Sequence, residues 1–203
     1  MRFTKLVRQE PGWETTSATT HWADNHLSVA TETVKTPTEK KARPWTIVHR
    51  KAAVVIAPLT EEGKFLLIRQ ERVPIRASIW EMPAGQIDDN AEPSEAEIVH
   101  VALRELHEET GYELAPAGEM IPLGHFFSSP GFTDEHCYFF LARPVRRSTV
   151  HHREEGEGIL DCRGFTPEEL SRMIAENEIR DSNTLSMCAR LAARGFLTFT
   201  AAR

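Results

Sequence analysis

The sequence predicts a mixed α/β sandwich, and three observations lead to this fold class. The first is an apolar, β-branched run over residues 52–57, which is typical of a strand buried on both faces of a sheet. The second is a helix with a well-marked start at Ser94 and a stop at Gly111. The third is the order of the elements. Strands and helices do not alternate strictly, which favours a mixed sheet over a purely parallel one.

Residues 1–48 are expected to form an arm and a β-hairpin extension, and residues 49–203 the main domain. Residues 1–20 are polar, rich in threonine and aperiodic, which indicates a loosely held arm. Apolar side chains then alternate with polar ones from Leu27, and again around Trp45 after a polar break. This pattern predicts two strands joined by a turn.

The main domain begins with three predicted strands. The buried run over 52–57 is the first, and a turn at 61–63 leads into the second over 65–68. A short third strand over 79–82 ends at the tripeptide Pro83-Ala84-Gly85.

The best-defined helix of the chain follows this tripeptide. Ser94 and Glu97 form the spacing of a capping box, in which each side chain satisfies a backbone N–H of the other residue. An apolar stripe then continues through Leu106. We expect the helix to end near Thr110, with Gly111 as the glycine that follows its last turn.

The rest of the chain predicts one more strand and two helices. The strand covers 136–142, and a long charged loop follows over 143–158. Thr166 is suited to cap a helix over 167–177, and a final amphipathic helix covers 183–193.

Composition excludes several classes of function. The formal net charge of −6 argues against nucleic-acid binding as the main activity, which needs a basic surface. The three cysteines form no CxxC pair, so neither a zinc site nor a disulfide framework is predicted. Residues 1–12 lack the apolar core of a signal peptide, and the longest apolar run, 52–59, is too short to span a bilayer. A cytoplasmic protein without membrane contact is expected.

The end of the long helix carries an unusual cluster of acidic side chains. Glu105, Glu108 and Glu109 stand at positions i, i+3 and i+4 and therefore share one side of the helix. Like charges at this spacing destabilise an isolated helix. A hard divalent cation such as Mg²⁺, which prefers oxygen ligands, would reverse the effect. The alternative is a solvated acidic face in which Arg104 pairs with Glu108.

The run from Arg104 to Tyr112 resembles the second half of the Nudix box, Arg-Glu-aliphatic-x-Glu-Glu-x-Gly followed by an aliphatic or aromatic residue. Every constrained position matches. The first half departs from the family, because Arg104 lies 19 positions after Gly85 rather than the usual 14. The middle glutamate of the box, which braces the helix by pairing with the arginine, therefore falls on Ala91 or Ala96. The residues that could replace it are Glu92, Glu95 and Glu97.

Other motifs resemble the ADP-ribose and nucleoside-diphosphate-sugar pyrophosphatase branch of that family. They lie at 68–72, 80–89, 129–135 and 179–181, and the similarity covers roughly residues 22 to 195. The resemblance implies the Nudix α/β/α sandwich with a mixed sheet, preceded by the hairpin. It also implies a homodimer, since in this branch the hairpin commonly exchanges between subunits and helps to build the neighbour's pocket.

The resemblance places the metal site on the catalytic helix. Glu105 and Glu109 would ligate Mg²⁺ with the Ala84 carbonyl, and Glu108 would contribute directly or through water. Mn²⁺ is a possible substitute. Mg²⁺ usually keeps several water ligands and is also coordinated by substrate phosphates, so few protein ligands are needed. Arg104 and Glu109 belong to the implied catalytic set.

The resemblance implies a general base in the acidic loop, just ahead of a strand that begins near Ile159. Glu154, Glu155 and Glu157 are the choices. Glu157 is favoured because it stands just ahead of that strand, and Glu155 is second.

Several residues are implied to bind the substrate. Arg72 and Arg50 would hold phosphate or the terminal ribose, because a guanidinium matches phosphate geometry. Trp45 matches a tryptophan that stacks on adenine, although it could instead belong to the core of the hairpin. A second stacking tryptophan expected near Leu27 is absent unless Trp22 takes its place. The remaining residues assigned to this site are Glu81, Phe132 and Glu135.

The implied activity is Mg²⁺-dependent hydrolysis of ADP-ribose, or of a related nucleoside-diphosphate sugar, to a nucleoside monophosphate and a sugar phosphate. One alternative is a Nudix hydrolase for a dinucleotide, CoA or a GDP-sugar. The other is a non-catalytic module that senses a nucleotide. The three retained glutamates argue against this second alternative, because a pure binder has no need of a costly carboxylate cluster.

Overall fold

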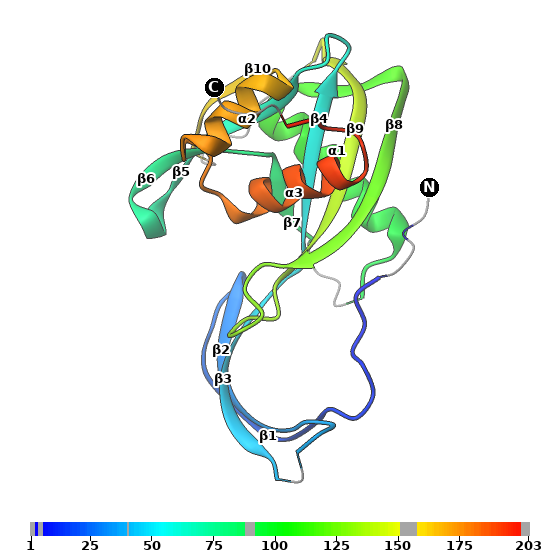
Figure 1. Ribbon diagram of the computed structural model, residues 1–203. Helices are drawn as coiled ribbons and strands as arrows, with labels where there is room; N and C mark the ends of the chain where they lie inside the picture. The colour runs from blue at the N-terminus through cyan, green and yellow to red at the C-terminus, as the bar shows by residue number, and fades with distance from the viewer. Residues whose placement is uncertain (1–2, 4–5, 40, 88–91, 151–157, 200–203) are drawn as a thin grey trace.

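A computed structural model describes residue 3 and residues 6–39, 41–87, 92–150 and 158–199. The chain forms a seven-stranded sheet between layers of helices and a separate three-stranded sheet (Figure 1). The elements are β1 (Glu14–Ala23), β2 (Leu27–Lys35), β3 (Arg43–Arg50), β4 (Ala53–Thr60), β5 (Phe65–Arg72), the 3₁₀ turn η1 (Val73–Ile75), β6 (Ala77–Glu81), β7 (Ala84–Gln86), α1 (Glu95–Thr110), β8 (Tyr112–Phe127), β9 (His136–Arg147), β10 (Ile159–Phe165), α2 (Pro167–Ala175) and α3 (Ser182–Ala193).

The central strand β4 is buried on both faces, as the sequence predicted. Val54 packs in a cluster with Leu106 of α1 on one side of the sheet. Val55 packs on the other side with Leu170 of α2 and Leu191 of α3. The large sheet therefore has α1 on one face and α2 with α3 on the other, which confirms the α/β/α sandwich.

The large sheet is mixed, which also confirms the prediction. Its main order is β10-β5-β4-β9-β8, and the β4–β9 pair is parallel while the other pairs are antiparallel. The short strand β6 pairs with β5, and β7 pairs with β4. The chain between β6 and β7 therefore passes from β5 to the central strand, which places Gly85 opposite Val54.

Helix α1 begins and ends where the sequence indicated. Ser94 and Glu97 make both hydrogen bonds of the capping box, and Gly111 ends the helix in the left-handed conformation at φ 76°. More than two turns precede Arg104, because the helix begins at Glu95. The carboxylate of Glu97 is engaged by Ser94 in the cap.

The prediction of a loosely held arm over residues 1–20 was wrong for its second half. Glu14–Ala23 forms β1, which pairs with β2 and turns the expected hairpin of β2 and β3 into a three-stranded sheet. Every residue of β1 is exposed, so no apolar alternation marks the strand in the sequence. Threonine, which is abundant here, nevertheless favours extended backbone.

The prediction of a charged loop over 143–158 was wrong for the first residues of that range, because β9 continues to Arg147. Cross-strand ion pairs stabilise this extension, with Arg146 bound to Glu113 at 2.8 Å and Arg143 bound to Glu119 at 3.3 Å on β8.

No helix in the described ranges is long and apolar enough to cross a bilayer.

Candidate active site

Two buried glutamates of α1 face the start of β7. Glu105 and Glu109 lie one helical turn apart, and their residues are 5% and 3% exposed. The Ala84 N–H donates a hydrogen bond of 2.8 Å to Glu109 Oε2. The structure thus brings together three of the residues that the sequence assigned to a metal site.

Gly85 lets the Glu105 carboxylate lie directly against the backbone. A Cβ atom at position 85 would stand 2.0 Å from the Glu105 carboxyl carbon, far inside van der Waals contact. Only glycine is compatible with this arrangement of Glu105. The motif glycine therefore has a specific task, which is to leave space for an acidic side chain.

Arg104 lies beside two of the acidic side chains. It donates to Glu105 Oε1 at 2.6 Å and to Glu108 Oε2 at 2.7 Å. The pairing with Glu108 is the one expected for a solvated acidic face, but the burial of Glu105 and Glu109 does not agree with that alternative.

The donor chemistry fits a hard divalent cation. Glu105, Glu108 and Glu109 offer carboxylate oxygens, with the Ala84 N–H bonded to Glu109 and Gly85 lying against Glu105. Within the described part of the chain, no three His, Cys, Asp or Glu side chains are already gathered around one metal position. Glu105 and Glu108 are instead directed toward Arg104.

Arg72 and Glu81 form an ion pair at the ends of β5 and β6. The guanidinium is bidentate, with Nε 2.9 Å from Oε1 and Nη2 2.9 Å from Oε2. Burial alone would lower the pKa of Arg72, but hydrogen bonding to Glu81, with attraction from Asp181 and Glu109, raises it overall. Burial raises the pKa of Glu81, and Asp181 adds to this, while Arg72 opposes it.

Asp181 is a residue of this site for which the sequence predicted no role. It acts electrostatically on Arg72, on Glu81 and on the buried Cys137, whose pKa burial raises to about 12. Its side chain caps α3 by accepting from the Thr184 N–H at 2.8 Å. Residues 179–181 were among the motifs that resemble the family, but the Asp-x-x-Thr spacing before a helix indicates a cap rather than a site.

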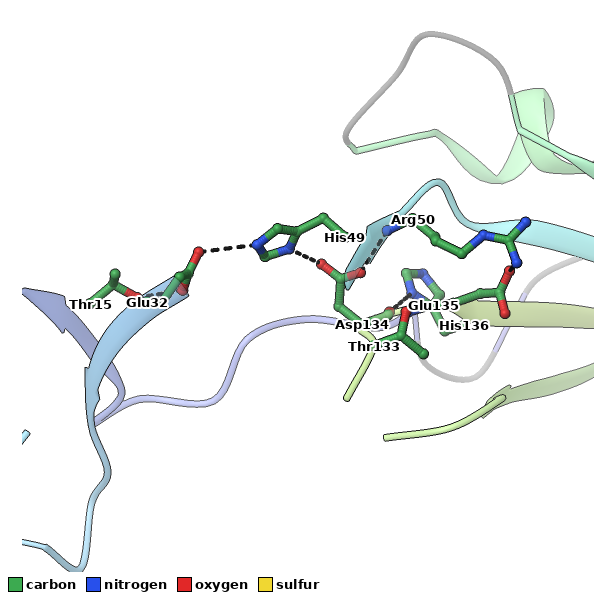
Figure 2. Close-up of polar contacts among 8 residues, drawn as sticks. All are labelled: Thr15, Glu32, His49, Arg50, Thr133, Asp134, Glu135 and His136. Carbon is green, nitrogen blue, oxygen red and sulfur yellow. Dashed lines mark hydrogen bonds and ion pairs between the residues drawn. The ribbon is translucent and has the colours of Figure 1, made fainter. Parts of the chain in front are cut away.

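A second group of predicted residues lies where β3 meets the loop before β9 (Figure 2). Arg50 Nη1 lies 2.9 Å from Glu135 Oε1, and the Arg50 N–H donates to Asp134 Oδ1 at 2.9 Å. Both Arg50 and Glu135 act electrostatically on Cys137, as does Asp181. Members of both groups therefore lie within electrostatic range of Cys137.

The three aromatic candidates are all exposed. Trp45 is 53% exposed on β3, so the alternative of a hairpin core residue was wrong. Figure 1 shows its sheet set apart from α1. Phe132 is 55% exposed, and its carbonyl accepts from the Val48 N–H at 2.8 Å. Trp22, the possible second platform, is 51% exposed on β1.

The candidates for the general base, Glu154, Glu155 and Glu157, lie outside the described residues. The nearest described residue is Gly158, whose carbonyl accepts from the Glu71 N–H at 2.9 Å. Gly158 is thereby placed beside the residue that precedes Arg72.

His49 joins the small sheet to the main domain through two carboxylates (Figure 2). Its Nδ1 lies 2.7 Å from Asp134 Oδ2, and its Nε2 lies 3.1 Å from Glu32 Oε1. Burial lowers the pKa of His49, but the hydrogen bond and attraction of Asp134, together with Glu32, raise it overall above 6.5. The protonated ring can donate to both acids.

Replacement of His49 should therefore have an effect that depends on pH. Because the folded-state pKa is raised, the stabilisation is fully present below about pH 6.5 and is lost as the pH rises through the folded-state value. We expect urea unfolding to show the largest loss of stability for His49→Gln at about pH 5.5, and a smaller loss at about pH 8.5. His100→Gln, at an exposed histidine of α1, is the matched control. A loss that stays constant or grows with pH would contradict this account.

Comparison with known proteins places the chain in a family. The model of the NUDIX domain matches residues 48–187. An ADP-ribose pyrophosphatase of Bacillus subtilis (strain 168) is 30% identical over 158 residues, which are 78% of this chain and 80% of that protein. A methanol dehydrogenase activator of Bacillus methanolicus is 34% identical over 139 residues, 68% of this chain and 71% of that protein.

A solved structure shares the fold. The crystal structure of an ADP compounds hydrolase aligns with a TM-score of 0.68 at 17% identity, over 94% of this chain and 100% of that one. Together with the family match and the buried glutamates of α1, these similarities show that the chain is a Nudix hydrolase of the branch that contains the ADP-ribose pyrophosphatases.

Proposed function

We propose that this protein hydrolyses the pyrophosphate bond of ADP-ribose in a Mg²⁺-dependent reaction that yields AMP and ribose 5-phosphate. The observation that carries the proposal is the burial of Glu105 and Glu109 against Ala84 and Gly85. Two buried carboxylates one turn apart favour a cation beside them, in addition to the positive charge of Arg104. The pyrophosphatase relative from B. subtilis supports the choice of substrate.

The residues of the site have distinct tasks in this proposal. Glu105, Glu109 and the Ala84 carbonyl hold Mg²⁺, with Glu108 beside them, and Mn²⁺ is the expected substitute. When bound, such a cation neutralises pyrophosphate charge and lowers the pKa of bound water. Arg104 holds Glu105 and Glu108 in place through the hydrogen bonds described above.

The substrate phosphates are assigned to two arginines. The Arg72 side chain is 41% exposed although it is bidentate to Glu81, so its guanidinium is accessible to a phosphate while its orientation is fixed. Arg50 is fixed in a comparable way by Glu135 and is 38% exposed. Phe132, on the same loop as Glu135, is assigned the contact with the sugar or the base in this proposal.

Glu157 is assigned the role of general base, with Glu155 as the second choice. The carbonyl of the adjacent Gly158 is bound to the Glu71 N–H, next to Arg72, which supports this assignment. Glu157→Gln is expected to lower kcat by at least about tenfold, since such groups contribute on the order of 10²–10⁴-fold. A smaller decrease in steady-state assays would place the base elsewhere.

The active protein is proposed to be a homodimer, with residues 1–48 contributing to its interface and residues 49–203 forming the hydrolase domain. The three-stranded sheet exposes Trp22 and Trp45, and Trp13 just before β1 is 47% exposed. Aromatic side chains of this kind are enriched at interfaces. Light scattering coupled to gel filtration should give the mass of a dimer, and a monomer at assay concentration would contradict this part of the proposal.

The substrate is best tested with a panel of compounds. ADP-ribose, other nucleoside-diphosphate sugars, dinucleotides and CoA are incubated with the protein and Mg²⁺, and the products are separated by chromatography. We expect the highest kcat/KM for ADP-ribose. Preference for another member would replace the substrate and keep the chemistry, while binding without turnover of any compound would indicate a nucleotide sensor.

A further inference from the structure

The short segment that precedes Gly85 is held at three successive residues by three different elements. The Met82 N–H donates to Thr184 Oγ1 of α3 at 2.9 Å. The Pro83 carbonyl accepts from the Ile56 N–H of β4 at 2.9 Å. The Ala84 N–H donates to Glu109 of α1 at 2.8 Å. The backbone next to the buried glutamates is thus fixed from the strand beside it and from both helical layers.

Thr184 is the most distant of these contacts in sequence, 102 residues from Met82. It is fully buried, and its hydroxyl makes two hydrogen bonds. The oxygen accepts from Met82, and the O–H donates to Asp181 Oδ2 at 2.8 Å. A hydroxyl whose hydrogen is taken up by a carboxylate must present its lone pairs elsewhere. Asp181 therefore orients Thr184 to accept from Met82.

The hydroxyl of Thr184 is not what holds α3 on the domain. Met187, Cys188 and Leu191 of α3 are all fully buried in the apolar cluster below the large sheet. This packing, together with the hydrogen bond of 2.7 Å that Arg190 Nη1 donates to the Leu123 carbonyl of β8, docks the helix without the Thr184 hydroxyl. The Thr184 hydroxyl instead serves the Met82 N–H, which belongs to a residue only 1% exposed and would otherwise lose its partner.

We propose that Thr184, oriented by Asp181, is a positioning residue for metal binding. Through Met82 it fixes the backbone that carries the Ala84 carbonyl and the space at Gly85 into which Glu105 fits. The C-terminal helix thereby controls the geometry of a site formed by α1 and β7. This inference rests on the proposed metal-dependent hydrolysis and adds a residue to it.

Thr184→Val tests the inference, because valine has nearly the same shape and lacks the hydroxyl. Thr184→Ser restores the hydroxyl and is the conservative counterpart. Ser171→Ala, which removes a hydroxyl from a residue 7% exposed on α2, controls for the loss of a buried polar group away from the site.

Three measurements are made on each full-length protein. Calorimetric titration with Mg²⁺ alone gives the metal affinity, steady-state kinetics give kcat and KM, and NMR gives amide hydrogen exchange at Met82 and Ala84. For Thr184→Val we expect metal affinity to fall by roughly 10–100-fold, as for other groups that orient metal ligands. We expect kcat to fall with it, KM to change far less, and both amides to exchange faster. Thr184→Ser and Ser171→Ala should bind Mg²⁺ like the unmodified protein.

Either of two results would overturn the inference. One is unchanged exchange at Ala84 in Thr184→Val, and the other is equal impairment of the valine and serine variants. Failure of the proposed function is a different result, in which the unmodified protein shows no Mg²⁺-dependent turnover. In that case, amide hydrogen exchange at Met82 and Ala84 would still decide whether Thr184 positions this backbone.

Discussion

Glu109→Gln is expected to lower Mg²⁺-dependent turnover by at least about 10³-fold. A metal ion contributes several kcal/mol to transition-state stabilisation, and each 1.36 kcal/mol corresponds to tenfold in rate. Glutamine removes the charge that would attract the cation. Its amide oxygen can still accept the hydrogen bond that Ala84 donates at 2.8 Å, so the fold should be retained.

The stability of this variant provides an independent check. Glu105 and Glu109 are like charges one turn apart and both are buried, so removing one charge should not destabilise the metal-free protein. We expect thermal unfolding without metal at or above the Tm of the unmodified protein, and a much smaller rise in Tm on adding Mg²⁺. Glu168→Gln, at an exposed glutamate of α2, is the matched control. Undiminished turnover in Glu109→Gln would show that the metal site is assigned wrongly.

Gly85→Ala is expected to have the second largest effect. The added Cβ would stand 2.0 Å from the Glu105 carboxyl carbon and 2.1 Å from Oε1, so the carboxylate must leave its position. The three atoms nearest to the added Cβ all belong to Glu105, so the displaced group is the end of a flexible side chain. Activity should therefore fall by about 10²-fold or more, a loss comparable to that of other groups that stabilise the transition state.

The Gly85→Ala variant should retain its fold while it loses activity. We expect circular dichroism and a cooperative thermal transition close to those of the unmodified protein, because the atoms nearest to the added Cβ belong to one flexible side chain. Calorimetry should show weaker binding of Mg²⁺ in proportion to the displacement of Glu105. Gly85→Ala with full activity and normal metal affinity would mean that the position of Glu105 against the backbone has no role in the reaction.

The parts of the fold with strong local signals could be predicted from sequence. Helix α1 was predicted with its cap and its end, because Ser94, Glu97 and Gly111 act within a few residues of the bonds that they satisfy. The buried strand β4 was predicted because both of its faces are apolar. The long strand β8 was not expected. It contains Pro122 and Gly124, which usually mark turns, and irregular pairing with β9 accommodates them.

The site was predictable to the extent that its residues follow one another in a motif. Glu105 and Glu109 lie together on α1. The pairing of β7 with β4 positions Ala84, whose N–H donates a hydrogen bond to Glu109. Asp181 and Thr184 could not be assigned a role in this way. Their link to Met82 joins segments that are distant in the chain, and only the packing of α3 against the sheet creates it.

The central claim is metal-dependent cleavage of a pyrophosphate bond, and product analysis tests it most directly. Purified protein is incubated with ADP-ribose in Mg²⁺, and in a parallel reaction with excess EDTA, and the products are identified by mass spectrometry. We expect equal amounts of AMP and ribose 5-phosphate with Mg²⁺ and none above background with EDTA. Intact ADP-ribose in both reactions, or equal cleavage in both, would contradict it.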